Sequence, residues 1–203
     1  IDFPPKYKKQ KPLIANVAPV IIATGNQIYC KQTYQKIVTD ITITDPDDTS
    51  TEAVYIQISS GYKNGQDQLT LTGLHPTITS SWDITTGKLK LYSPTGIPVS
   101  YFDLIAAIKD IEYTNFSATP SGIREFSISV GQANFLPSNG HYYQFVSNLG
   151  ISWSDAKIAA ENSTYYGLQG YLATITALDE ALLVGEQASG TGWIGGTDEE
   201  QEG

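Results

Sequence analysis

The sequence predicts a mainly β protein with two domains, an antiparallel β-sandwich followed by a smaller α+β domain. Three observations lead to this prediction. Apolar and polar residues alternate in short runs between residues 17 and 130, as in half-buried strands. Residues that form regular structure poorly gather at 132–140. Two helix-start signals follow, at Ser152 and Thr176. We therefore expect a sandwich over 17–131, a linker over 132–140 and the second domain over 141–203.

The first 16 residues carry four lysines and three prolines and have little apolar periodicity. This composition predicts an extended linker or arm. Two interpretations remain open for it: a solvated spacer, or a docking segment for an acidic partner.

The sandwich prediction rests on five runs of alternating apolar residues: Ile37, Ile41 and Ile43; Val54, Ile56 and Ile58; Leu69 and Leu71; Leu89 and Leu91; and Phe126, Ile128 and Val130. Turn-forming residues separate the runs, at 64–65 (Asn-Gly), 86–87 (Thr-Gly) and 120–122 (Pro-Ser-Gly). Short strands at this spacing indicate an antiparallel β-sandwich. The apolar stretch 101–108 is expected to form a short helix or a crossover.

Four segments of this region also share a pattern with a known family. Residues 44–48, 84–89, 111–115 and 120–124 resemble the recurring signature of cadherin-like repeats in large bacterial adhesins. The resemblance implies a cadherin-like, immunoglobulin-like sandwich that forms part of a stalk, often with calcium between repeats. Gly131-Gln132 stands where such a repeat usually ends in Asp-Gly, so the sequence departs from the family at the inter-repeat calcium position.

Asp45, Asp47 and Asp48 form a dense carboxylate cluster in the first domain. Calcium prefers several oxygen ligands, so these residues are the candidate metal ligands, and calcium is the candidate cofactor. The same Asp-Pro-Asp-Asp run is equally typical of a turn, because Asp side chains accept hydrogen bonds from nearby backbone N–H groups. Both interpretations stay open.

The second domain begins with an expected strand at 141–146, rich in aromatic residues. Ser152 offers a helix N-cap with Asp155 three residues on, and Trp153, Ala156 and Ala160 fall on one face of that helix.

A short extended segment is expected at 171–175, before a second helix that starts at Thr176 with Asp179. Leu178, Ala181 and Leu182 predict its buried stripe, and Glu180 and Glu186 are expected to face outward.

The order of these features, completed by residues 192–198 (Gly-Trp-Ile-Gly-Gly-Thr-Asp), resembles the first half of a C-type lectin domain. The resemblance implies a packed core strand at 193–195 and sugar binding through calcium. The triplets that hold calcium and sugar in that family would fall beyond Gly203. We therefore expect the domain to continue past Gly203, and the ligand-binding residues are unknown. The sequence has one cysteine, Cys30, so no disulfide can form within the chain. In this respect it resembles the bacterial branch of the C-type lectin family, since many animal members are rich in disulfides.

The composition argues against three classes of function: nucleic-acid binding, membrane spanning and catalysis. A net charge of −9 argues against nucleic acid as a partner, because no basic stripe neutralises phosphates. No apolar run approaches membrane-spanning length. The two histidines, His75 and His141, stand in no recognisable catalytic or zinc motif, so we expect no enzyme.

The two resemblances together imply an exported adhesin at the bacterial cell surface or outside the cell. The sandwich would serve as the stalk, and the lectin-like domain would bind a glycan on a surface or neighbouring cell. A secretion translocon or another surface protein is a conceivable partner. The alternative is a lectin fold that acts as a protein-binding or structural module without sugar binding.

Overall fold

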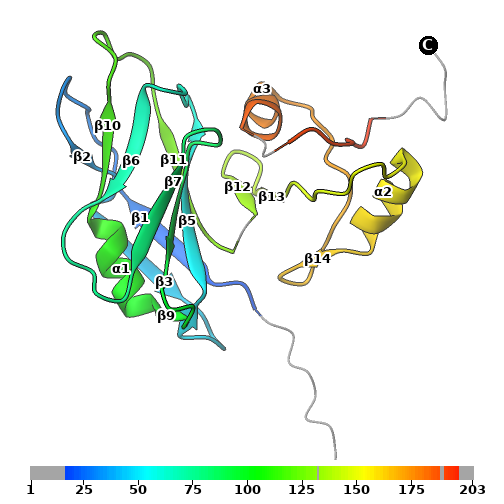
Figure 1. The fold of residues 1–203 in the computed structure, drawn as a ribbon, viewed down its shortest axis with the longest axis horizontal. Coiled ribbons are helices and arrows are strands. Elements are labelled where there is room, and N and C mark those ends of the chain that lie inside the picture. Colours follow the sequence, from blue (N-terminus) through cyan, green and yellow to red (C-terminus); the bar gives the residue numbers. More distant parts are fainter. Residues whose placement is uncertain (1–16, 132, 188–189, 197–203) are drawn as a thin grey trace, which may run out of the picture.

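The computed structural model describes residues 17–131, 133–187 and 190–196. The expected arm at 1–16, Gln132 and the acidic tail at 197–203 lie outside this part of the chain. Figure 1 shows a β-sandwich and a second, smaller part beside it. The structure is mainly β with a few short helices, in agreement with the predicted fold class.

The sandwich has a four-stranded antiparallel sheet in the order β11-β5-β8-β7. Its strands are β5 (Ala53–Ser60), β7 (Thr79–Asp83), β8 (Lys88–Tyr92) and β11 (Glu125–Val130). Facing it, β10 (Ile111–Asn115) pairs with β2 (Gln35–Lys36) and β6 (Asp67–Leu71), and β1 (Val20–Thr24) pairs with β3 (Asp40–Thr44). The short strands β4 (Ser50–Thr51) and β9 (Val99–Ser100) also pair.

The core contains the apolar residues that the alternation predicted. Val54, Ile56 and Ile58 are fully buried on β5, and Leu69, Leu89 and Leu91 pack in the same cluster. The expected turn at 86–87 joins β7 to β8 directly, and Gly87 has the positive φ that glycine adopts without strain.

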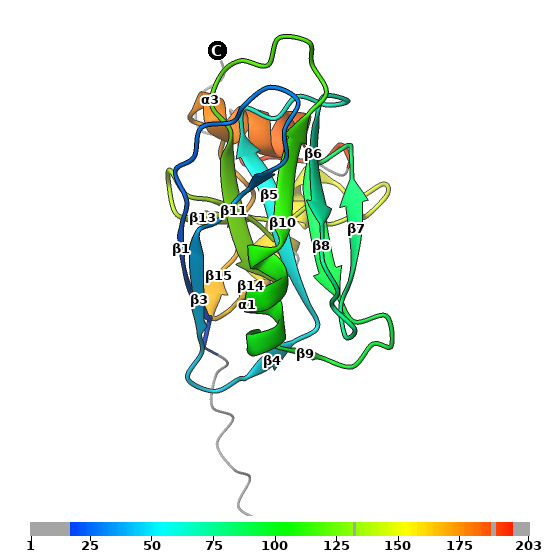
Figure 2. The same cartoon turned by 90° about the vertical axis from the view of Figure 1, so that its left-hand side faces the viewer.

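The apolar stretch that was expected to be a helix or a crossover is α1 (Tyr101–Lys109). Ser100 caps it by accepting a hydrogen bond from the Asp103 N–H, and Leu104, Ala107 and Ile108 are buried. Figure 2 shows α1 at one end of β10, so that the chain turns from the helix directly into a core strand.

The second part starts with a hairpin inside the expected linker. β12 (Asn134–Leu136) pairs with β13 (His141–Tyr143), and Ala133 and Leu136 are buried. The region 132–140 was expected to lack regular structure because its residues are poor strand formers. Pairing with β13 and packing of β12 next to β11 and β5 outweigh that local preference.

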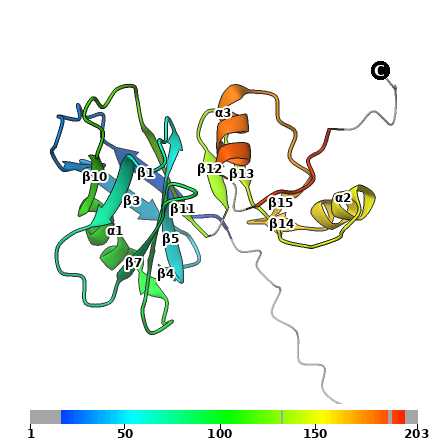
Figure 3. The same cartoon turned by 45° about the horizontal axis from the view of Figure 1, so that its top comes forward.

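The other elements of the second part are short. They are α2 (Trp153–Glu161), β14 (Thr164–Tyr165), β15 (Leu168–Gln169), α3 (Leu178–Glu180) and the π-helical turn η1 (Ala181–Glu186). Figure 3 shows β12 and α3 between the sandwich and α2.

The predicted face of α2 is confirmed, because Trp153, Ala156 and Ala160 are its partly buried residues. The predicted stripe of the last helix is confirmed in part, because Ala181 and Leu182 are partly buried and Glu186 is exposed, but it is wrong for Leu178 and Glu180. Leu178 is 76% exposed, whereas Glu180 is only 4% exposed and Leu183 is fully buried. Glu180 turns inward because its carboxylate accepts hydrogen bonds from the chain that precedes the helix.

The second part covers the outer face of β5. Gln57 and Ser59, which alternate with the core residues of this strand, are also buried, as are Ser127 and Ser129 on β11. η1 contacts β5, and Gln187 donates to the carbonyl oxygens of Ile58 at 2.9 Å and Thr86 at 2.8 Å. One sheet of the sandwich is therefore covered on both sides.

Candidate functional site

The acidic turn, residues Asp45, Asp47 and Asp48, directly follows β3. The Oδ1 atom of Asp45 accepts hydrogen bonds from the backbone N–H groups of Asp47 and Asp48, both at 3.1 Å. This is the turn geometry that Asp side chains favour. The three carboxylates each place an oxygen within 4.8 Å of the others. The structure thus brings the three predicted metal ligands together.

Tyr101 at the start of α1 fixes the other side of Asp45. Its hydroxyl donates to Asp45 Oδ2 at 2.8 Å. Partial burial opposes ionisation of Asp45, but the bonds from Tyr101 and from the two N–H groups outweigh it and lower the pKa of this carboxyl. Burial and the nearby Asp45 raise the pKa of Tyr101. Asp45 is therefore ionised at neutral pH.

The turn fits a hard cation only in part. Both oxygens of Asp45 already accept hydrogen bonds, and Asp47 Oδ2 accepts one from the Val17 N–H at 3.1 Å. Asp48 is exposed. Because calcium takes six to eight oxygens, protein carboxylates here would supply a minority, and water would complete the shell.

In the second part, two tryptophans tie the expected core segment to the start of α2. Trp153 Nε1 donates to the Ile194 carbonyl and Trp193 Nε1 to the Ile151 carbonyl, each at 2.8 Å. The predicted packed strand at 193–195 is wrong for the described residues, which form no strand there. Trp193 is 54% exposed, and the single bond from the Gly195 N–H to the Ala173 carbonyl does not make a ladder.

Glu180 is the centre of a polar cluster that the sequence analysis missed. Its Oε1 accepts from the Tyr143 hydroxyl at 2.6 Å and the Asn139 amide at 3.0 Å. Its Oε2 accepts from the backbone N–H and the hydroxyl of Thr176 and from the Ala177 N–H. The bond from Tyr143, followed by those from Thr176, lowers the pKa of Glu180 to about 2. The sequence did contain a signal for this cluster: an acidic residue at the third position of a helix often bonds the backbone before that helix, and Glu180 stands four residues after Thr176.

The side chains of the two histidines contact neither the acidic turn nor Glu180 among the hydrogen bonds of the described residues. His75 Nε2 is 3.2 Å from Asp110 Oδ2 and 3.1 Å from the Thr72 carbonyl oxygen. His141 is exposed, with its Nδ1 3.4 Å from the Tyr171 hydroxyl. Both arrangements are polar contacts of surface loops and strands.

Comparison with known proteins finds one similarity to report. The chain is 33% identical to Halomucin from Haloquadratum walsbyi in an alignment over 172 residues, which covers 80% of this chain and 2% of that protein's length. No protein-family model matches the chain, and no solved structure matches it. Among the described helices, none combines the length and the apolarity needed to cross a bilayer. The similarity supports a protein of the cell surface or the extracellular space.

Proposed function

We propose that this chain is a module of an exported cell-surface adhesin, with the sandwich as stalk and the second part as the surface that contacts a glycan. The observation that carries the proposal is the similarity over 172 residues to Halomucin, a large surface glycoprotein. The stalk role of the sandwich rests on its resemblance to cadherin-like repeats, and the glycan-binding role of the second part rests on its resemblance to C-type lectins. Export through a secretion translocon, or contact with another surface protein, belongs to the same proposal.

The contacts between the two parts support a stalk that holds its head in a fixed position. Gln187 bonds two carbonyl oxygens of the sandwich, and the hydroxyls of Tyr165 and Tyr166 donate to the Val130 carbonyl at 2.9 and 3.3 Å. Lys88 also donates to Asn134. Burial of Lys88 lowers its pKa to about 8. These bonds join segments distant in sequence and hold the second part against the sandwich.

Calcium at the acidic turn is part of the proposal. Asp47 and Asp48 are exposed carboxylates beside an Asp45 that is held ionised, which is the charge arrangement a hard cation uses. The cation would brace the loop between β3 and β4 against α1. Chelation is then expected to lower the melting temperature of the wild-type chain, while the double variant Asp47→Asn, Asp48→Asn melts at one temperature with or without chelator.

The test of function is a glycan array probed with the full-length protein, including the residues expected beyond Gly203, with and without a calcium chelator. Binding of a neutral or acidic glycan that the chelator abolishes is the expected result. An array on which the full-length protein binds nothing in either condition overturns the carbohydrate proposal. Labelling of intact cells with an antibody against the chain tests the location, and a signal only after permeabilisation contradicts surface exposure.

A protein-binding or structural role is the second candidate. The observation that favours it is a set of exposed apolar side chains on the second part: Val146, Leu149, Ile158, Leu168, Trp193 and Ile194. On a protein-binding module, these side chains would supply the apolar contacts to the partner. A glycan array that shows no binding, together with loss of cell–cell adhesion in a Trp193→Ser variant, would support the protein-binding role.

A further inference from the structure

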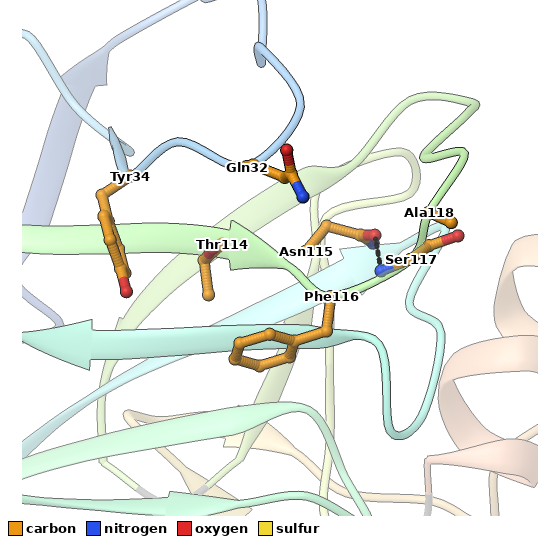
Figure 4. Close-up of a pocket in the computed structure, with 7 residues that line it drawn as sticks. All are labelled: Gln32, Tyr34, Thr114, Asn115, Phe116, Ser117 and Ala118. Atoms are coloured by element: carbon orange, nitrogen blue, oxygen red, sulfur yellow. Dashed lines mark hydrogen bonds between the residues drawn. The ribbon is translucent and has the colours of Figure 1, made fainter.

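A groove of about 370 Å³ lies at the end of β10 that is distant from α1. Its lining comes from the loop before β2 and from the end of β10 with the loop that follows (Figure 4). The lining residues are Gln32, Tyr34, Thr114, Asn115, Phe116, Ser117 and Ala118. All seven are uncharged, in a protein whose net charge is −9.

Two aromatic rings flank this groove. Tyr34 is 69% exposed and Phe116 is 64% exposed, and they come from loops that are distant in sequence. Figure 4 shows both side chains beside Thr114, at the side of the groove away from Ser117 and Ala118. A flat aromatic ring that stays in contact with water offers a large apolar surface at little entropic cost to a ligand with a flat apolar face.

Polar groups occupy the rest of the groove. The amide of Gln32 extends from the loop above Asn115 (Figure 4), and the hydroxyl of Thr114 lies between the two loops, where it donates to the Thr33 carbonyl at 3.1 Å. The side-chain oxygen Oδ1 of Asn115 accepts from the Ser117 N–H at 2.9 Å. Because hydroxyl and amide groups both donate and accept, the groove can exchange hydrogen bonds with the hydroxyls of a ligand.

The floor of the groove is held rigidly by buried polar contacts. The Asn115 amide donates to Asp67, whose carboxylate also accepts from the Tyr113 hydroxyl at 2.7 Å and pairs with Arg124 at 2.7 Å. The Phe116 N–H donates to the Gln66 carbonyl at 2.8 Å. The charges beneath the groove are therefore neutralised against each other, and the positions of Asn115 and Phe116 are fixed before a ligand arrives.

Gln32 itself stands in a backbone conformation that favours glycine. Its φ is +60° in the turn that the bond from the Thr33 N–H to the Cys30 carbonyl closes at 3.2 Å. A side chain at such a position costs free energy that glycine would avoid. Its amide extends into the groove, so a glycine variant separates the side chain's contribution to binding from its contribution to the fold.

We propose that this groove binds one sugar ring of a neutral oligosaccharide. A pyranose ring has an apolar C–H face, which packs on Tyr34 or Phe116, and a rim of hydroxyls, which exchange hydrogen bonds with the exposed amide of Gln32. An acidic ligand finds no cation among the lining residues, and an apolar ligand leaves the polar groups of the groove without partners. The site belongs to the stalk rather than to the second part, needs no calcium and goes beyond the proposed function.

The test measures binding of neutral glucose, mannose, galactose and N-acetylglucosamine oligomers to the whole chain by ligand-observed NMR. The expected result is binding of at least one oligomer that weakens by about tenfold in Tyr34→Ala and in Phe116→Ala, the loss expected for one stacked ring. Phe102→Ala is the matched control, since Phe102 is an 83% exposed ring on α1, and it is expected to bind as the wild type does. Gln32→Gly is expected to weaken binding without lowering the melting temperature.

Several outcomes overturn this inference. Neutral oligomers that show no binding to the wild-type chain are one, and binding that persists unchanged in both Tyr34→Ala and Phe116→Ala is another. Binding only of acidic oligosaccharides, or only of a proline-rich peptide, also contradicts it. Glycan binding that a chelator abolishes and that Tyr34→Ala and Phe116→Ala leave unchanged supports the proposed function of the second part. The same result refutes a sugar site on the sandwich.

Discussion

Glu180 is a carboxylate whose stability contribution has a defined pH window. The folded protein lowers its pKa from 4.5 to about 2, chiefly through the Tyr143 hydroxyl and Thr176. A carboxyl with a depressed folded-state pKa stabilises the fold fully above the unfolded pKa and loses that contribution as pH falls through the folded one. Between pH 4.5 and about 2 we therefore expect the wild type to lose stability on acidification.

Glu180→Gln tests this window. The variant cannot ionise, so its melting temperature should lie below that of the wild type at pH 7, and the gap should close as pH falls toward 2. Glu186→Gln is the control, because Glu186 is an exposed acid on the neighbouring turn. Thermal unfolding followed by circular dichroism across this range gives the comparison. A gap between wild type and Glu180→Gln that stays constant with pH would refute the assignment.

Two helices share one capping arrangement, which permits a comparison between elements. In α1 the Asp103 N–H donates to Ser100 Oγ, and in α2 the Asp155 N–H donates to Ser152 Oγ, each at 3.1 Å. Replacing either serine by alanine removes the cap, with an expected loss of about 1 kcal/mol. The surroundings differ, because α1 buries four residues in the core and α2 buries none.

Ser100→Ala is therefore expected to lower the global free energy of unfolding, measured in urea. Ser152→Ala should act locally and increase amide hydrogen exchange in α2, with a smaller change in global unfolding. Ser147→Ala is the control, since Ser147 is an exposed serine of the loop before α2 and lies outside the cap. Equal global losses in both cap variants would show that α2 is as tightly coupled to the core as α1.

The elements with a regular hydrophobic period could be predicted from sequence, and those that depend on tertiary partners could not. The runs around Ile56, Leu69, Leu89 and Ile128 became strands because alternation places one side of each in the core. β12 has no such signal, and it forms through pairing with β13. Trp193 was expected in a core strand, but its indole instead bonds the Ile151 carbonyl at the surface.

The candidate site shows the same limit. Asp45, Asp47 and Asp48 are adjacent in sequence, so their clustering could be predicted, whereas the hydroxyl of Tyr101 reaches Asp45 from α1. The Glu180 cluster draws on Asn139, Tyr143 and Thr176, which no local pattern relates to one another. Spacing along the chain predicts neighbours within a turn or helix, and long-range partners follow only from the fold.

At the scale of the molecule, the second part completes the burial of the sandwich. Gln57 on β5 would be exposed on a free sheet, yet it is buried, and its amide donates to the Thr86 carbonyl at 3.1 Å. Gln187 donates to the same carbonyl and to that of Ile58, so two glutamines and two backbone carbonyls share one buried interface. A module built in this way presents its second part in one orientation relative to the sandwich.

Gln187→Leu is the test of that coupling. The substitution keeps the volume but removes both hydrogen bonds and leaves the Ile58 carbonyl without its Gln187 donor, at an expected cost of about 1–3 kcal/mol. Gln169→Leu is the matched control, because the Gln169 amide also donates to a backbone carbonyl, that of Glu161, but does so at the surface. Hydrogen exchange read by mass spectrometry should show faster exchange in β5 and the 178–187 segment of Gln187→Leu, with Gln169→Leu close to the wild type. If both variants exchange alike, the two parts are held together by apolar packing, and the buried glutamine does not fix their orientation.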